Sequence, residues 1–165
     1  MKEFFTEFRN DHRQIRDLVM NSIEMINQNR SDKANILLEE LNQVAGPHFR
    51  FEEESLYPEL IPIYGGEYIN KLYTDHDLAI ARFKKLKSIM TKEELSEEER
   101  RSVSSLLRGM LPHLSDCEGL TIMVELFDKK KIDHIFRSMI KARKEQTSLM
   151  NWAESERGRK ELKIV

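Results

Sequence analysis

The stretch that decides how this chain folds is GPHFRFEEESLYP, residues 46–58. It continues a helical pattern from the residues before it, and His48 and Glu52 lie four residues apart, about one turn, on the same helix face. The Gly-Pro pair at its start predicts a kink, because proline removes a backbone hydrogen bond from a helix interior, and the proline at its end predicts the helix end. We therefore expect a histidine and a carboxylate side by side on a bent helix.

On both sides of this stretch, apolar residues recur every three or four positions, which is typical of amphipathic helices. No run of alternating apolar and polar residues indicates a β-strand. The pattern predicts an all-α fold, an antiparallel up-down-up-down four-helix bundle with short turns. The expected helices cover approximately residues 4–27, 32–57, 68–90 and 97–127.

Proline, glycine and capping residues mark the expected connections. A loop that contains Pro62 and the glycines at 65 and 66 leads into the third helix. Two capping boxes, beginning at Thr91 and Ser96, offer alternative starts for the fourth helix. Pro112 lies within that helix and is expected to bend it.

The C-terminal segment, residues 128–165, differs from the rest of the chain in charge. It carries 11 Lys/Arg and 6 Asp/Glu, whereas residues 1–127 carry 16 and 23. An apolar stripe from Ile132 to Ile140 predicts a fifth, amphipathic helix that continues to about Trp152. We divide the chain into a four-helix bundle, residues 1–127, and this basic C-terminal helix and tail. The stripe is expected to dock on the bundle or on a second copy of the chain, which would make a homodimer.

Length and composition exclude several classes of protein. At 165 residues the chain is long enough for one core but not for two large domains. Because Cys117 is the single cysteine, there is no intrachain disulfide and no cysteine-rich zinc site. No apolar run approaches the ~18 residues of a membrane span. The acidic bundle argues against a nucleic-acid partner, and acidic residues near the start, in place of an apolar leader, predict a cytoplasmic protein.

Four of the five histidines, one in each expected helix, are predicted to lie at a common height. In an antiparallel bundle, residues on consecutive helices are level when the turn between them falls at their sequence midpoint, because both helices rise equally per residue. The midpoints fall at residues 30, 62 and between 94 and 95, all within expected connections. The fifth, His134, lies beyond the bundle and is expected on the surface. The four level residues are His12, His48, His76 and His113.

Carboxylates accompany two of these histidines, with Glu52 four residues after His48 and Glu118 five residues after His113. Buried imidazoles in an apolar layer need partners, because each unsatisfied polar group costs about 1–3 kcal/mol. A metal ion supplies such a partner, and imidazole nitrogens with carboxylate oxygens suit iron, manganese or zinc. Two carboxylates from different helices can bridge a pair of ions. The pattern therefore favours a metal site over core histidines with ordinary hydrogen-bond partners.

The stretch from His48 to Pro58 resembles the helix-two signature of the hemerythrin-like family, also called the HHE cation-binding domain. That signature is a histidine, paired glutamates and a Leu-Tyr/Phe-Pro ending, and histidines on the other three helices fill the remaining family positions. The resemblance covers roughly residues 3–127 and implies a non-heme centre of two iron ions. It implies that His12 and His48 bind one iron and His76 and His113 the other, with Glu52 and Glu118 as bridges and Glu53 as an alternative to Glu52.

One departure from the family concerns the third helix. Oxygen-carrying hemerythrins have His-x-x-x-His there, but this chain has Ile80 at the second place. One iron would then have an additional open position for water or substrate, which argues against plain oxygen carriage. Ile80, and Tyr73 one turn before His76, are the residues expected to face a bound ligand. Four-histidine members of the family are linked to nitric oxide or oxygen sensing, iron-cluster repair and peroxide chemistry.

Three functions are compatible with this pattern. The first is a di-iron protein that binds or reacts with oxygen, nitric oxide or peroxide in a sensing, scavenging or redox role. The second is a di-iron enzyme, namely a peroxidase, a nitric oxide reductase or an oxygenase. The third is a metal-stabilised interaction module that uses the C-terminal helix. Cys117, four residues after His113, would suit a softer ion such as zinc, whereas Tyr57 is expected only to pack.

Overall fold

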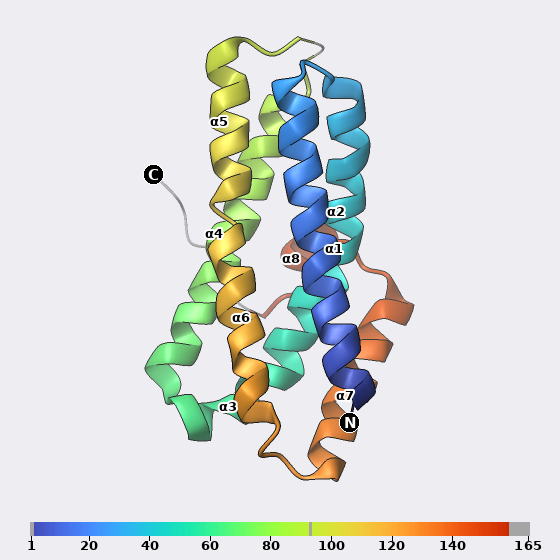
Figure 1. Cartoon of the computed structure of the whole chain (residues 1–165), viewed down its shortest axis with the longest axis vertical. Coiled ribbons are helices and arrows are strands. Elements are labelled where there is room, and N and C mark those ends of the chain that lie inside the picture. The colour runs from blue at the N-terminus through green and yellow to red at the C-terminus, as the bar shows by residue number, and fades with distance from the viewer. Residues whose placement is uncertain (1, 93, 159–165) are drawn as a thin grey trace.

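Four columns of helix run side by side and in alternating directions in the computed structural model, which describes residues 2–92 and 94–158 (Figure 1). Among these residues there is no strand, and none of the helices would span a lipid bilayer. The predicted all-α, up-down-up-down bundle is therefore confirmed. The columns are α1 (Lys2–Asn27); α2 (Ser31–Phe51) with its continuation η1 (Glu52–Leu56) and α3 (Tyr57–Tyr64); α4 (Gly66–Ile89); and α5 (Glu97–Arg108) with α6 (Leu111–Val124).

The second column contains a π-helix, η1, where the sequence predicts a helix end. Pro58 does not stop the helix, because it lies in the first turn of α3, where the missing N–H costs no helical hydrogen bond. The backbone N–H of Tyr57 donates instead to the carbonyl of Glu52, five residues back. Pro62 also lies within α3, and the chain turns at Gly65, whose φ of 80° favours glycine.

The fourth column is divided close to the expected bend. Helix α5 ends at Arg108 and α6 begins at Leu111, so that Pro112 falls in the first turn of α6. Ser96 begins α5 with a complete capping box, since its hydroxyl accepts from the backbone N–H of Glu99 and the Glu99 carboxylate accepts from that of Ser96. The alternative box that begins at Thr91 includes residue 93, which lies outside the described residues.

The apolar core consists of two clusters of buried side chains, one toward each end of the bundle. Ile15, Leu18 and Phe83 belong to the first cluster, and Phe4 and Phe8 belong to the second. The predicted histidines meet both clusters. The His12 ring packs at 4.4 Å from the Phe8 ring, and the His76 ring stacks at 3.8 Å on that of Phe49 from the first cluster.

The C-terminal segment folds back onto the bundle as two helices, α7 (Lys129–Glu145) and α8 (Leu149–Ser155) (Figure 1). The prediction of one helix to Trp152 is wrong, because Gln146 adopts a left-handed conformation that ends α7 and Ser148 caps α8. The apolar stripe of α7 docks on the bundle, the first of its two expected partners: Ile132 and Ile135 are fully buried in the cluster that contains Phe4.

Gly46 makes this docking possible, and α2 continues through Gly46 and Pro47, as the sequence predicts. A Cβ atom at residue 46 would lie 2.2 Å from the carbonyl oxygen of Thr147 and 2.5 Å from the backbone nitrogen of Leu149. Backbone atoms cannot move aside as flexible side chains do. The absence of a side chain at position 46 therefore lets the turn between α7 and α8 lie against α2.

We predict that Gly46→Ala lowers the free energy of unfolding by about 1–3 kcal/mol, the usual cost of overpacking a close contact. The matched control is Gly119→Ala, which lies in the exposed face of α6 with nothing within 4 Å of an added Cβ. That variant should gain up to about 1 kcal/mol from helix propensity. Urea unfolding followed by circular dichroism measures both; equal effects of the two substitutions would contradict the proposed role of Gly46.

Candidate metal centre

The four predicted histidines meet at one level of the bundle, each from a different column. The ring centroids of His12 and His48 lie 4.7 Å apart, and those of His76 and His113 lie 4.5 Å apart. No ring is more than 6% exposed. The midpoint argument thus placed the histidines correctly, because the helices end at Asn27, Tyr64 and Ile89, close to the midpoints it used.

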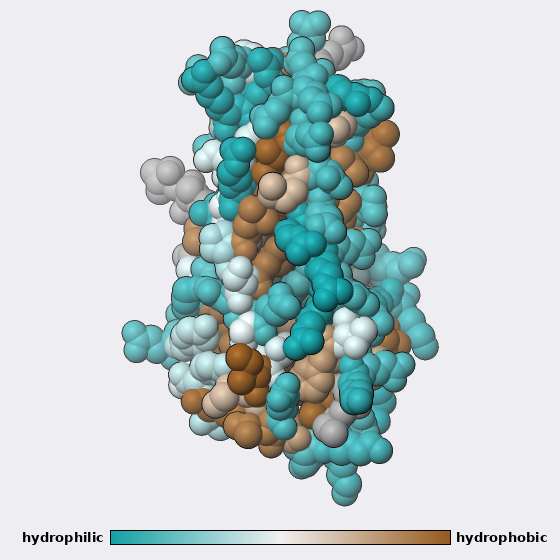
Figure 2. Space-filling view, in the orientation of Figure 1, coloured by the Kyte–Doolittle hydropathy of each residue, from teal (hydrophilic) through white to brown (hydrophobic). Residues whose placement is uncertain are grey.

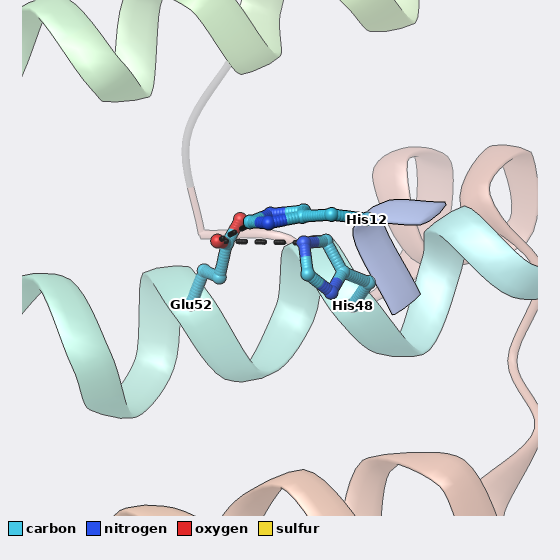
Figure 3. Close-up of side chains that lie close together, drawn as sticks. All are labelled: His12, His48 and Glu52. Carbon is cyan, nitrogen blue, oxygen red and sulfur yellow. Dashed lines mark ion pairs between the residues drawn. The ribbon is translucent and has the colours of Figure 1, made fainter. Parts of the chain in front are cut away.

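Glu52 lies between the two histidine pairs and is fully buried. Its Oε1 atom lies 3.4 Å from His48 Nε2 and 3.9 Å from His12 Nε2, and the close-up shows this carboxylate facing both rings (Figure 3). Its Oε2 atom lies 3.1 Å from His76 Nε2. One oxygen therefore faces each pair, which is the arrangement of a carboxylate that bridges two ions.

Tyr57 reaches the second pair, although the sequence indicated only a packing role. Its hydroxyl lies 3.2 Å from His76 Nε2, 3.4 Å from His113 Nε2 and 3.1 Å from Cys117 Sγ, and it donates to Glu52 Oε2 at 3.2 Å. In an α-helix residues 52 and 57 would be rotated apart by about 140°. The π-helix between them aligns residues five apart, and a π-turn is not visible in the apolar periodicity.

The donor set fits a metal, because its inward-facing atoms lack other partners. Both ring nitrogens of His12, Nε2 of His48 and Oε1 of Glu52 are buried without a hydrogen bond. Each such atom costs about 1–3 kcal/mol when it stays unsatisfied. Two groups of ligand atoms are close enough to hold an ion, and Glu52 belongs to both. They are His12, His48 and Glu52, and Glu52, His76 and His113.

The electrostatics of the layer also suit metal binding. Burial and the nearby His48 lower the pKa of His12 to about 3, so this imidazole is neutral. Burial by itself lowers the pKa of His48, but Glu52 and Asp11 outweigh it and raise that pKa to about 10. Burial opposes ionisation of Glu52, yet His48 and His76 hold its pKa well below the usual range. The carboxylate is thus ionised, and metal binding would displace a proton from His48.

Glu118, the second expected bridge, does not join this layer. Its side chain is half exposed, and its Oε1 atom lies 3.9 Å from Nε of Arg9 on α1. Cys117 takes the inward position on α6 instead, fully buried with Sγ 3.3 Å from His113 Nε2. The reason is helical phase, because a residue four positions after His113 shares its face and a residue five positions after it is rotated away.

The remaining sequence candidates take positions around the layer. Glu53 contacts the outer nitrogen of His76, Nδ1, at 2.9 Å, so it stands behind the ring and not between the pairs. The Tyr73 hydroxyl donates to the Glu53 carbonyl at 3.1 Å, and its ring packs edge-on against Tyr57. Ile80 is fully buried and brings no ligand atom to the second pair. His134 is exposed on α7, as expected.

A pocket of 370 Å³ leads from the surface to the layer between α1 and α6. His12 lines its inner end, together with Leu111 and Leu114, and Ser115 and Glu118 lie at its edge. The space-filling view shows hydrophobic side chains between α1 and the α5–α6 column, and others near the lower end of the same face (Figure 2). Arg13 and Arg16 also line this pocket, which makes it a candidate route to the first pair for a small neutral or anionic ligand.

Fold and site together define a class of protein, the helical bundles that hold a metal site of histidines and carboxylates in their core. The family model of the hemerythrin HHE cation binding domain matches residues 4–137, and the chain belongs to that family. The earlier resemblance is thus confirmed. The comparisons found no significant match among curated proteins or solved structures.

We predict that His12→Leu does not destabilise the metal-free protein, because it removes two buried nitrogens that have no partner. The same substitution should reduce the stabilisation that ferrous iron or zinc gives the unsubstituted chain, because it removes one of the two groups of ligand atoms and leaves the other. Thermal unfolding with a chelator and with added metal measures both effects. The matched control is His134→Gln on the surface of α7, which should respond to metal as the unsubstituted chain does; a loss of response there would contradict the assignment.

Proposed function

We propose that this chain is a non-heme di-iron protein that binds or reacts with oxygen, nitric oxide or peroxide at a carboxylate-bridged metal pair, in a sensing, scavenging or redox role. The observation that carries the proposal is the position of Glu52, whose two oxygens face two separate histidine pairs. A single ion would need only one of the two histidine pairs. Imidazole with carboxylate suits first-row metals, so zinc or manganese are the alternatives to iron.

The chain supplies the binding geometry and the exclusion of water. A pair of iron ions contributes positions for small ligands and changes of oxidation state. His12 and His48 would hold one ion, and His76 and His113 the other, all within a layer that the two apolar clusters close on both sides. The Tyr57 hydroxyl donates to Glu52 Oε2 and also contacts Cys117 Sγ. It would therefore lie beside the ion held by His76 and His113, as a hydrogen-bond donor.

Metal analysis tests this proposal directly. We expect about two iron ions per chain after reconstitution with ferrous iron, and an absorption spectrum that changes on addition of oxygen or azide. Glu52→Gln should reduce the content to one ion or fewer, because it removes the ionised bridge. The matched control is Glu54→Gln, an exposed neighbour in the same π-helix. Fewer than one metal per chain in the unsubstituted protein would defeat the di-iron proposal.

The surface pocket provides a second test, on ligand access. Ser115→Trp fills the edge of the pocket without touching the core, so azide should bind the iron-loaded protein several-fold more slowly, at unchanged metal content. Ser105→Trp is the control, because Ser105 is also exposed, on α5, but does not line the pocket. Stopped-flow absorption measures the rates. Equal rates in both variants would show that ligands enter elsewhere.

A di-iron enzyme is the second candidate, and one observation favours it. The Tyr57 phenol and the Cys117 thiol lie 3.1 Å apart beside the second pair, where both would offer a hydrogen bond to a reacting ligand. If the protein is an enzyme, steady-state consumption of peroxide or nitric oxide with a supplied electron donor should vanish in His76→Ala. Stoichiometric binding without turnover would favour the sensing or scavenging role.

The third candidate, an interaction module based on the C-terminal helix, is less favoured. The apolar stripe that would contact a partner is already used inside the protein, since Ile132, Ile135 and Met139 are each at most 1% exposed. Homodimerisation through this helix, a cytoplasmic location and the division of the chain at residue 127 stay predictions.

A further inference from the structure

Three of the four histidines have a carboxylate behind the ring, two of them within hydrogen-bond distance. The outer nitrogen Nδ1 lies 3.2 Å from Asp11 in His48, 2.9 Å from Glu53 in His76 and 3.6 Å from Asp75 in His113. Such contacts orient an imidazole so that Nε2 points to the metal, and they make it a stronger donor.

Each of these carboxylates is in turn held by a cation. Arg143 Nη2 donates to Asp11 at 2.6 Å, Arg157 Nη2 donates to Glu53 at 2.7 Å, and Lys71 Nζ donates to Asp75 at 2.8 Å. Lys71 belongs to the bundle. The two arginines belong to the C-terminal segment and lie beyond residue 137, where the family match ends.

Arg157 is the more deeply placed of the two arginines, with a side chain 1% exposed against 31% for Arg143. Nε and Nη2 of Arg157 donate to both oxygens of Glu53, and Nη1 lies 2.6 Å from Asp77, which is also buried. Its guanidinium lies 5.5 Å from the centre of the Trp152 ring, on α8. This one cation therefore balances two buried carboxylates, one of which holds His76.

We propose that Arg143 and Arg157 are positioning residues through which the C-terminal segment controls the metal-binding histidines. Arg157 acts on His76 through Glu53, and Arg143 acts on His48 through Asp11. A guanidinium that holds the carboxylate in place keeps the imidazole oriented, and it draws negative charge from the carboxylate and so moderates the donor strength of the ring. The inference rests on the metal centre proposed above. It adds that α7 and α8 are part of that centre and not an appendage.

Cobalt(II) is a suitable probe, because its visible absorption bands report the geometry and donor strength of its ligands without any turnover. We expect Arg157→Gln to shift these bands and to weaken cobalt binding, measured by competition with a chelator, by up to about tenfold, the lower end of the effect of losing a direct partner of a ligand. The lost orientation of His76 should outweigh the gain in its donor strength. Arg157→Lys keeps the positive charge but loses the bidentate contact with Glu53, and it should recover part of the cobalt affinity. Arg143→Gln should act in the same direction but less, because Arg143 is partly exposed.

Arg50→Gln is the matched control. Arg50 forms ion pairs with Glu145 at the end of α7 and with Glu156 after α8, so it ties the same segment to the bundle without holding any histidine's carboxylate. We expect unchanged cobalt bands and affinity in this variant. If Arg50→Gln weakens cobalt binding as much as Arg157→Gln, the effect comes from loosening the segment, and the proposal is overturned.

Two further variants separate positioning from folding. The double variant Arg157→Gln/Asp77→Asn removes the guanidinium together with one of its two buried carboxylates, so that one fewer buried charge is left unpaired. Its circular dichroism should be normal, and its cobalt absorption bands should still be shifted as in Arg157→Gln. In a Glu53→Gln background, Arg157→Gln should have no further effect on the bands, because the proposed path runs through Glu53. Independent effects of the two substitutions would contradict that path.

Failure of this inference is distinguishable from failure of the proposed function. If the unsubstituted chain binds cobalt and loses it in His76→Ala, while Arg157→Gln matches the unsubstituted chain in bands and affinity, only the positioning role is overturned. If the unsubstituted chain binds no cobalt at the histidine layer, the metal centre itself is absent and both proposals fall.

Discussion

The burial of one ionised carboxylate among four imidazoles is the constraint on which the rest of this structure depends. Glu52 is fully buried, and an isolated charge there would be costly. His48 and His76 hold its pKa low, and both rings are anchored in turn by Asp11 and Glu53. Around Glu52, histidines, then carboxylates and then arginines follow one another outward. Both ring nitrogens of His12 and Nε2 of His48 still have no hydrogen-bond partner in this layer.

The π-helix is the local adjustment that this centre requires. An α-helix through residues 52–57 would bring Glu52 to the layer and turn Tyr57 away from it. The additional residue in the turn lets both side chains face the histidines, and it also places Glu53 behind His76. Pro58 suits this geometry because it lies in the first turn of the next helix, where no N–H is needed.

The C-terminal segment contributes both packing and charge. Its apolar stripe completes the cluster around Phe4 and Phe8. The start of α8 can lie against α2 because Gly46 has no side chain. Arg143 and Arg157 then extend from this segment to the carboxylates behind two histidines. Packing and electrostatics therefore converge, since the same fold-back that buries the stripe brings the arginines to their partners.

The helices, the bundle and the common level of four histidines could be predicted from the sequence. This was possible because apolar periodicity and turn residues are local signals, and because the equal rise of antiparallel helices converts sequence midpoints into heights. The four-residue spacing from His48 favoured Glu52 but left Glu53 as an alternative, since the kink expected at Pro47 made the helical phase uncertain. The groups that complete the layer emerge only from the packed fold: Cys117 and Tyr57 face inward, Glu118 lies at the surface, and Arg157 reaches Glu53 from 104 residues away. Helical phase near a proline and contacts between distant segments depend on packing, which no local pattern encodes.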